Sequence, residues 1–276
     1  MDLYDKISEL GKRRGILFPS FEIYGGVSGF FDYGPIGSQL KHNIEDEWRR
    51  LFVQREGMVE LESTMIMPEQ VFLASGHLTH FTDVLTKCTQ CGKEYRADHL
   101  LNELGLQCPE GLKAEELNKL IKEREARCPE CGGSLSDTEP FNLMFQLKIG
   151  SHIENQTGYG RPEAGQGQFL DFKRIYASER ERLPLGIAQV GRCVRNEIAP
   201  RKGPIRLREF TIIDYEVFID PDDASYPRIK LLKDQKLRIL TAKEQSAGTN
   251  RVMEITVEET LNKGLVVNEV LCYFMA

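Results

Sequence analysis

Apolar residues recur every three or four positions in two segments near the start of the chain. In residues 35 to 57 this spacing predicts a long amphipathic helix, which Pro35 begins and Gly57 ends. Its apolar side carries Ile36, Leu40, Ile44, Trp48 and Leu51. A shorter pattern, with Asp2 as the cap and Gly11 as the stop, predicts a first helix that packs through Leu3, Ile7 and Leu10.

Later segments are apolar runs of strand length. The runs "FNLMFQLKIG" (141–150), "PLGIAQVGRCVRNE" (184–197) and "LREFTIIDYEVFI" (207–219) predict strands of a mainly antiparallel sheet. The segment "MVELESTMIMP" (58–68) is expected to be extended, and its closing Pro68 suits an edge strand or an interface. Helices and strands in this order predict an α+β fold.

Composition limits the possible functions. The chain has 276 residues, of which 41% are hydrophobic, enough for one large core or a core with a small satellite module. Its formal net charge of −6 gives no overall positive field, so any contact with nucleic acid should be local. No apolar stretch has the length of a signal peptide or a membrane span, which indicates a cytoplasmic protein without membrane contact.

Two Cys-x-x-Cys pairs mark residues 87 to 137 as an inserted module. Each pair, Cys88 with Cys91 and Cys128 with Cys131, puts two thiolates on a tight turn that the following glycine helps to close. Two such turns make a closed tetrahedral site, which predicts a structural Zn²⁺ with no open position for chemistry. The alternatives are free buried thiols or a redox pair, and Cys108 is a spare thiol that can replace one ligand.

The segment "RCVRNEIAPRKGPIRLREF" (192–210) is rich in basic residues although the chain is acidic. On a strand from Val190 to Glu197, alternation puts Arg195 and Glu197 on one side. On a partner strand, one face mixes an aromatic ring with carboxylates, and it carries Phe210, Ile212, Asp214, Glu216 and Phe218. The opposite face is mostly apolar and is expected in the core, and it carries Thr211, Ile213, Tyr215 and Val217.

The mixed face suits a bound ligand. A Pro/Gly loop between the two strands carries Arg201, Lys202 and Arg206, and such a loop can close over a triphosphate or a nucleic-acid end. The alternative to a ligand-binding face is an ordinary sheet surface with salt bridges between neighbouring strands. A second cluster, "GYGRPEAGQGQF", predicts a glycine-rich turn with Arg161 and Glu163 around a proline, and it carries little weight alone.

Taken together, these segments resemble a class II aminoacyl-tRNA synthetase, specifically glycyl-tRNA synthetase of the archaeal and eukaryotic dimeric type. The block "FPSFEIYGGVSGFFDYGPIG", the string "YRADHLL" and the turn "GYGRPEAGQG" resemble stretches of that family, the helix and strand up to Pro68 resemble motif 1, and "VRNEIAPRKGPIRLREF" resembles motif 2. The resemblance implies an antiparallel sheet flanked by helices, with an inserted zinc-binding module. The implied domains are a catalytic core in 1–86 and 138–276, interrupted by the module in 87–137.

The resemblance also implies the roles of residues in an ATP site. Arg195 would be catalytic, since it would contact the α-phosphate where charge builds up as the glycine carboxylate attacks. Glu197 would hold the adenine edge, Phe210 would stack on the ring, and Mg²⁺ would bridge the phosphates. The remaining implied ATP-binding residues are Asn196, Ile205, Arg206, Leu207, Arg208 and Glu209.

Glycine selection would depend on its ammonium group and on a pocket too small for a methyl group. By resemblance Glu163 and Asp214 would bind the ammonium, with Arg96 and Arg161 as neighbours. Two departures affect this pocket. Ala164 and Gly165 stand where the family turn has Thr-Ala, and Asp214 stands where the family has a longer Glu.

The implied reaction is activation of glycine with ATP to glycyl-adenylate and its transfer to tRNA(Gly), by a homodimer joined through the helix from Pro35 and the strand up to Pro68. The Gly-x-Asp-Arg string of motif 3 does not occur in the sequence. We therefore expect an incomplete enzyme that lacks motif 3 and the anticodon-binding domain. The alternative is a synthetase-like paralogue or fragment that acts as a non-catalytic RNA-binding or accessory subunit.

Overall fold

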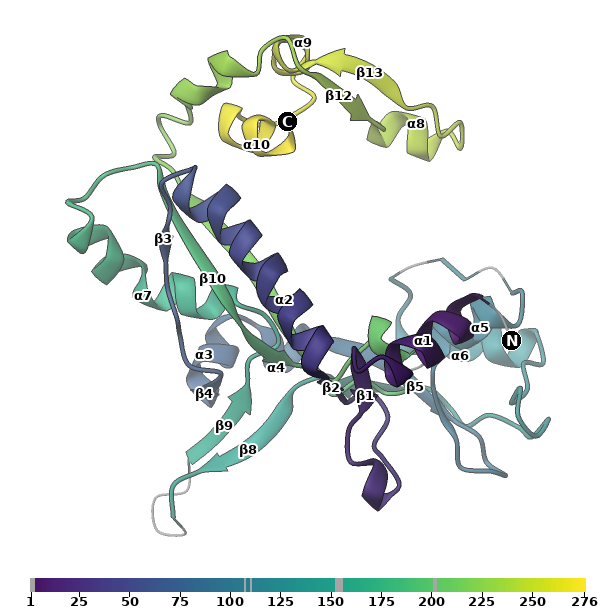
Figure 1. Cartoon of the computed structure of the whole chain (residues 1–276). Helices are drawn as coiled ribbons and strands as arrows, with labels where there is room; N and C mark the ends of the chain where they lie inside the picture. The colour runs from purple at the N-terminus through teal and green to yellow at the C-terminus, as the bar shows by residue number, and fades with distance from the viewer. Residues whose placement is uncertain (1–2, 107, 110, 152–155, 201–202) are drawn as a thin grey trace. The chain divides into compact units, whose positions relative to one another are not determined.

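The computed structural model describes residues 3–106, 108–109, 111–151, 156–200 and 203–276. The chain divides into two compact units, residues 1–172 with 187–216 and residues 173–186 with 217–276. Figure 1 labels the helices and strands of both. Among the described residues, no helix is both long and apolar enough to cross a membrane.

The first unit begins with helices and a small hairpin. Helix α1 (Leu3–Arg13) runs past Gly11, so the predicted stop there is wrong, and its apolar side chains are exposed; the predicted cap Asp2 lies outside the described residues. Strands β1 (Leu17–Pro19) and β2 (Phe31–Tyr33) pair antiparallel around the short helix η1 (Glu22–Tyr24). Helix α2 (Pro35–Trp48) starts at the predicted proline and continues as a π-helical turn, η2 (Arg49–Gln54), before Gly57 at φ 70°.

Short sheets follow in place of one large sheet. The segment after Gly57 is extended only in β3 (Val59–Glu60) and β4 (Ile66–Pro68), and helices α3 (Glu69–Ala74) and α4 (His77–His80) come next. Strands β8 (Phe145–Ile149) and β9 (Gln156–Gly160) form the antiparallel hairpin drawn in teal in Figure 1, and β4 pairs antiparallel with β9. Since most of the strand pairs among the described residues are antiparallel, the α+β prediction with antiparallel sheets is confirmed.

The cysteine module is built on a second antiparallel sheet. Strand β5 (Thr82–Lys87) lies between β6 (Glu94–Arg96) and β7 (Glu139–Asn142). Helices α5 (Ala97–Glu103) and α6 (Ala114–Glu123) pack on each other through a buried cluster that includes Leu101, Leu117 and Ile121. Helix α6 therefore lies in the chain between the two cysteine pairs.

Strand β10 (Leu185–Val194) lies between β11 (Glu209–Phe218) and β3, and it runs parallel to β3. It ends at Val194, so the predicted strand to Glu197 is too long: residues 195–197 lie beyond it. Side chains on the predicted core face of β11 are only half-buried, and Tyr215 stacks on Phe52 with ring centres 5.4 Å apart. The half-burial of this face means that it contributes less to the core than predicted.

The end of β10 is where separate segments of the first unit meet. The amide of Val194 donates to the carbonyl oxygen of Arg161 (2.9 Å), and the amide of Asn196 donates to that of Leu143 (2.7 Å). The glycine-rich segment predicted as a turn is divided here. Only residues 161–164 lie between β9 and helix α7 (Gly165–Ser178).

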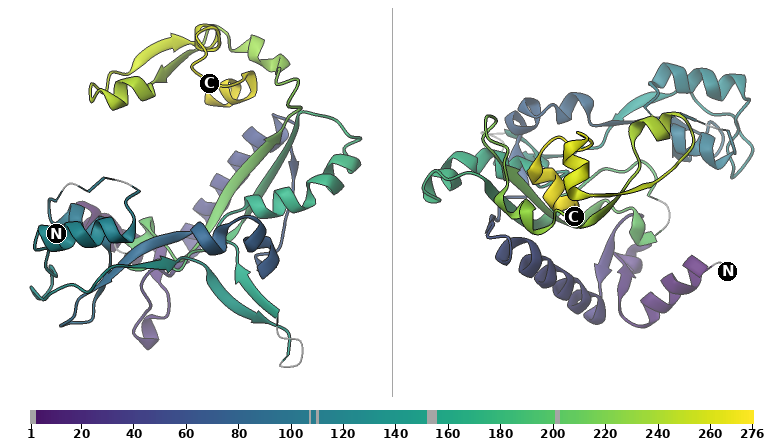
Figure 2. Two further views of the ribbon diagram at one scale, coloured as in Figure 1. Left: turned by 180° about the vertical axis from the view of Figure 1, so that it is seen from behind. Right: turned by 90° about the horizontal axis from the view of Figure 1, so that it is seen from above.

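The second unit has its own small core. The hairpin of β12 (Lys236–Ile239) and β13 (Met253–Thr256) is antiparallel, and Figure 2 shows it from two further sides. Its core includes Leu237, Val257 and Tyr273. The other elements of this unit are η4 (Pro227–Leu231), α8 (Ala242–Ser246), α9 (Val257–Asn262) and α10 (Glu269–Met275).

Candidate active site and metal centre

A cavity of about 500 Å³ opens at the end of β10, where the loop 195–208 begins. Of the residues predicted for ATP, six line it: Arg195, Glu197, Ile205, Arg206, Leu207 and Phe210. Arg96, predicted as a neighbour of glycine, lines it as well, whereas Glu163 is not among its lining residues. Most of the predicted ATP residues and Arg96 thus meet around one hollow, whereas Glu163, Asp214 and Arg161 of the predicted glycine site do not line it.

Arg195 is held between two aromatic rings. Its guanidinium carbon lies 5.5 Å from the ring centre of Phe81 and 5.4 Å from that of Phe210, distances at which a cation is attracted to a ring face. Its Nε donates to the carbonyl oxygen of Pro162 (3.0 Å), and its amide donates to that of Arg208 (2.8 Å). Backbone and side chain are both fixed, so the cation has a defined position in the cavity wall.

Charged side chains of opposite sign face each other across the cavity. Burial raises the pKa of Glu197, and the nearby guanidinium of Arg206 opposes that shift. Burial also raises the pKa of Asp83, which pairs with Arg96 (Nη1 to Oδ2, 3.1 Å). The cavity therefore offers positive charge for phosphates and carboxylates that can accept from the edge of a base.

Other predicted ATP residues hold the loop together. Arg208 donates through Nη2 to the carbonyl oxygen of Glu197 (2.7 Å) and through Nη1 to that of Ser28 (2.9 Å). Glu209 pairs with Arg192, and the backbone of Asn196 bonds to Leu143. None of the three predicted residues lines the cavity. Arg201 and Lys202, predicted on the same loop, lie outside the described residues.

Three carboxylates gather near the start of α7. Burial raises the pKa of Asp214 and that of Glu216, and the charge of Glu163 raises both further. Glu163 accepts from Nε2 of Gln166 (2.7 Å) and lies 3.3 Å from Nε2 of His77. Mutually repelling carboxylates of this kind attract a small cation such as an ammonium group.

Arg161 is buried and bonded to the protein itself. Its side chain is 2% exposed, its Nε donates to the carbonyl oxygen of Arg192 (2.8 Å), and its Nη1 donates to Oγ of Ser63 (2.7 Å). The same hydroxyl accepts from Nε2 of the fully buried Gln189 (2.7 Å). This network joins the end of β9, β10 and the segment before β4.

The two residues that depart from the family turn are both buried, and Gly165 begins α7. A methyl group on Gly165 would meet Phe169 at 3.9 Å and Oε1 of Glu216 at 4.0 Å, which is ordinary contact. Space for a small side chain therefore remains at this position.

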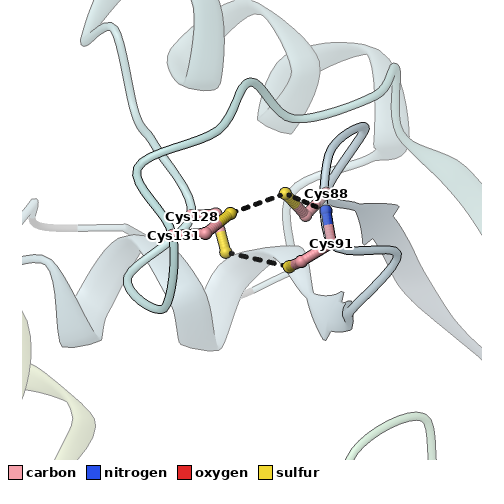
Figure 3. A group of neighbouring side chains, drawn as sticks. All are labelled: Cys88, Cys91, Cys128 and Cys131. Atoms are coloured by element: carbon pink, nitrogen blue, oxygen red, sulfur yellow. Dashed lines mark hydrogen bonds between the residues drawn. The ribbon is translucent and has the colours of Figure 1, made fainter.

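The four predicted cysteines form one group (Figure 3). The sulfur atoms of Cys88, Cys91, Cys128 and Cys131 all lie within 4.8 Å of one another, with 3.5 Å between Cys88 and Cys131 and 3.7 Å between Cys91 and Cys128. A tetrahedral site with Zn–S bonds of about 2.3 Å needs sulfur atoms roughly 3.8 Å apart. The group therefore fits Zn²⁺.

Matching turns build the two halves of this centre. Gly92 and Gly132 both have φ 72°, a left-handed conformation that favours glycine. The amide of Gly92 donates to the carbonyl oxygen of Cys88 (3.0 Å), and the amide of Gly132 donates to that of Cys128 (2.9 Å). The buried hydroxyl of Tyr95 lies 3.0 Å from Sγ of Cys128. Cys108 is not in the group, and its amide bonds to Asn102 instead.

Several residues of the site were not predicted from the sequence. Phe81 and Asp83 precede the cysteine module and carry no motif, so only folding brings them to Arg195. His77 and His99 do not have the sequence spacing of metal ligands, so no pattern singled them out. Glu216 had a signal, because strand alternation puts it on the same face as Asp214.

Comparisons with known proteins give one similar fold and several similar sequences. No protein-family model matches the chain. The fold is similar to the RNA binding domain of threonyl-tRNA synthetase from Cryptosporidium parvum Iowa II, with a TM-score of 0.50, 20% identity, and coverage of 81% of this chain and 39% of that one. At this identity the likeness concerns the fold alone.

The nearer relatives are glycine–tRNA ligases. The chain is 50% identical to that of Aeropyrum pernix over 280 residues, which covers 100% of this chain and 48% of the relative. It is 49% identical to that of Methanothrix thermoacetophila (100% and 47%) and 48% identical to that of Thermococcus gammatolerans (99% and 48%). The chain spans about half the length of these relatives, and the resemblance predicted from its motifs is confirmed over its whole length.

Proposed function

We propose that the chain is the ATP- and glycine-binding part of a glycine–tRNA ligase. The observation that carries the proposal is the position of Arg195, held between Phe81 and Phe210 in a cavity that Glu197 and Arg206 also line. A fixed cation beside aromatic and acidic side chains suits a nucleotide with its phosphates. The sequence identity to glycine–tRNA ligases supports the same function. It favours the ligase over the alternative of a non-catalytic accessory subunit.

The reaction follows from this arrangement. The carboxylate oxygen of glycine attacks the α-phosphorus of ATP, and pyrophosphate leaves with the electrons of the broken P–O bond. Arg195 stabilises the negative charge that grows on the α-phosphate, Glu197 accepts from the adenine edge, and Phe210 stacks on the base. When bound with the nucleotide, Mg²⁺ would supply positive charge to its phosphates. The adenylate then passes its glycyl group to tRNA(Gly).

The carboxylates of Glu163, Asp214 and Glu216 are the proposed ammonium site. Burial and the charge of Glu163 raise the pKa of Asp214 and that of Glu216, and a bound ammonium group would relieve the repulsion between the carboxylates. Arg161, two residues before Glu163, is held by Ser63 and by the backbone of Arg192. Selectivity for glycine would then depend on how closely the protein packs around the bound ligand, because a methyl group forced into a packed site costs about 1–3 kcal/mol.

The remaining proposals concern the fold class, the metal, the oligomeric state and the location of the protein. We propose a class II synthetase core, a structural Zn²⁺ on the four cysteines, a homodimer and a cytoplasmic location. When bound, the metal would join the two knuckle turns and so hold the β5–β6 hairpin that carries Asp83 and Arg96.

Glycine-dependent exchange of labelled pyrophosphate into ATP tests the function. The chain is assayed alone and with the other half of a glycine–tRNA ligase added as a separate polypeptide, and ATP binding is titrated in parallel. We expect ATP binding in both cases and exchange with glycine but not with alanine in the mixture. Failure of exchange in both samples, together with no ATP binding, would contradict the proposal.

A further inference from the structure

Arg206 contacts a histidine from another part of the chain. Its Nη1 lies 3.2 Å from Nδ1 of His99 in α5, a helix of the cysteine module. A guanidinium group has only donors, so Nδ1 must accept this hydrogen bond. The two residues are far apart in the sequence. The histidine of the motif "YRADHLL" has no role assigned from the sequence.

The histidine itself is held firmly. Arg96 donates through Nε and Nη2 to both carboxylate oxygens of Asp98 (2.8 and 2.9 Å), and Oδ1 of Asp98 accepts from the amide of His99 (2.8 Å). Arg96 also pairs with Asp83 on β5. The backbone of His99 is thereby fixed to the same strands that form the opposite wall of the cavity.

The surroundings of His99 keep its ring uncharged. Burial lowers the pKa of His99, the guanidinium groups of Arg96 and Arg206 lower it further, and Asp98 and Asp83 oppose the shift. An uncharged imidazole keeps the lone pair on Nδ1 that Arg206 needs. The electrostatics therefore agree with the geometry of the contact.

A neutral acceptor has a consequence that a carboxylate would not have. It orients the guanidinium without cancelling its charge, so the attraction for a phosphate is retained. The side chain of Arg206 has two other places to go. Glu197 attracts it within the proposed nucleotide cavity. A second cavity of about 420 Å³, lined by both His99 and Arg206, offers space for the guanidinium to turn away. Without His99, Arg206 could pair with Glu197 or turn away.

We propose that His99 is a positioning residue that holds Arg206 at the nucleotide cavity as an oriented, fully charged donor for the phosphates of the nucleotide. The inference rests on the proposed function, since it needs a triphosphate in that cavity. It adds a residue of the inserted module to the machinery for phosphate binding, although His99 itself does not touch the reacting atoms.

Three variants of one position test the role of the acceptor. His99→Asn keeps a neutral acceptor close to the position of Nδ1, His99→Asp adds a charge to nearly the same shape, and His99→Ala removes the acceptor. Each is made in the full chain with and without Arg206→Ala, and MgATP binding is titrated by calorimetry. Circular dichroism confirms that each variant is folded.

We expect His99→Ala to weaken MgATP binding about tenfold, as a hydrogen bond to a charged group predicts. His99→Asn should stay within about threefold of the wild type, and His99→Asp should bind as poorly as His99→Ala because it neutralises Arg206. In the Arg206→Ala background the three variants should bind alike, since the effect passes through Arg206.

The outcomes separate this inference from the function on which it rests. If the wild type binds MgATP and Arg206→Ala weakens binding, while His99→Ala binds as the wild type does, the positioning role is wrong. Equal binding by the Asn and Asp variants would also overturn it. If the wild type binds no nucleotide, the proposed function fails and the role of His99 fails with it.

Discussion

The guanidinium carbon of Arg195 lies 5.4 Å from the centre of the Phe210 ring, although Arg195 follows the end of β10 and Phe210 lies in β11. The hydrogen bond from the amide of Arg195 to the carbonyl oxygen of Arg208 closes the loop between β10 and β11 and brings the pair together. Phe81, from the loop between α4 and β5, covers the other side of the cation. The backbone hydrogen bond therefore holds the guanidinium of Arg195 beside the ring of Phe210 without a bound ligand.

Replacing Arg195 with Lys keeps the charge and removes the planar group that lies between the rings. A lysine ammonium cannot stack in this way or donate from the same direction to Pro162. We expect ATP affinity to fall about tenfold in Arg195→Lys, measured by calorimetric titration. Arg238→Lys, at an exposed position on β12, is the matched control and should bind as the wild type does. Unchanged ATP affinity in Arg195→Lys would mean that the stacked geometry has no role.

The cysteine group gives a prediction about metal content. Cys91→Ser should lose the bound zinc, because it removes one of four sulfur ligands, whereas Cys108→Ser should retain it, since this thiol lies outside the group. Mass spectrometry under native conditions measures the metal per chain. We expect chelation of the wild type to lower the thermal midpoint by at least about 5 °C. Equal zinc content in the two variants would refute the assignment of ligands.

The sequence was most informative where local chemistry determines structure. Pro35 and the apolar spacing predicted α2, and the Cys-x-x-Cys pairs with their glycines predicted both knuckle turns and their meeting. Gly11 failed as a helix stop because a glycine in a helix costs only about 1 kcal/mol. Intrinsic preferences of that size are easily outweighed.

The site was predicted only in part because its remaining residues meet through tertiary contacts. Alternation along a strand put Arg195 and Glu197 on one side, and both line the cavity although the strand ends before them. Nothing in the local sequence indicates that Phe81 covers Arg195 or that His99 contacts Arg206. Such contacts depend on how the cysteine module packs, which a linear pattern does not record.

Two glycines at the start of α7 should respond oppositely to a methyl group. A Cβ on Gly167 would lie 2.0 Å from Oγ of Ser63, the hydroxyl that bonds Arg161 and Gln189. We expect Gly167→Ala to cost about 1–3 kcal/mol of unfolding free energy. Gly165→Ala has room and should be neutral or stabilising by up to about 1 kcal/mol. Urea denaturation measures both, and equal effects would show that the Ser63 contact is not tight.

The carboxylate at Asp214 gives a prediction about pH. Because burial and Glu163 raise its pKa, the folded chain binds more protons than the unfolded chain just above the ordinary carboxyl range. The unfolding free energy therefore falls as the pH rises through that window. Asp214→Asn removes this loss and still accepts from the amide of Tyr215. It should stabilise the fold at about pH 7.5, with the gain vanishing near about pH 3.5, while weakening glycine binding.

Asp137→Asn is the matched control with the opposite sign. The hydrogen bond from Lys122 lowers the pKa of Asp137, so its stabilising contribution is present above the ordinary carboxyl range and is lost as the pH falls. This variant should be less stable than the wild type at about pH 7.5 and equal to it at low pH. Urea denaturation at both pH values checks the pair. A loss of stability in Asp214→Asn at neutral pH would contradict the assigned repulsion.

The apolar face of α2 predicts how the chain associates. Ile36, Leu40 and Ile44 repeat along one side of the helix and are 55%, 51% and 55% exposed. Burying such a side chain contributes about 1.5–3 kcal/mol, so this face suits a contact with a second copy. We expect sedimentation of the wild type at micromolar concentration to show a dimer and Leu40→Asp to be a folded monomer. Leu73→Asp, on α3 and 57% exposed, introduces the same charge elsewhere and should remain dimeric. A monomeric wild type, or a dimer that survives Leu40→Asp, would count against association through this helix.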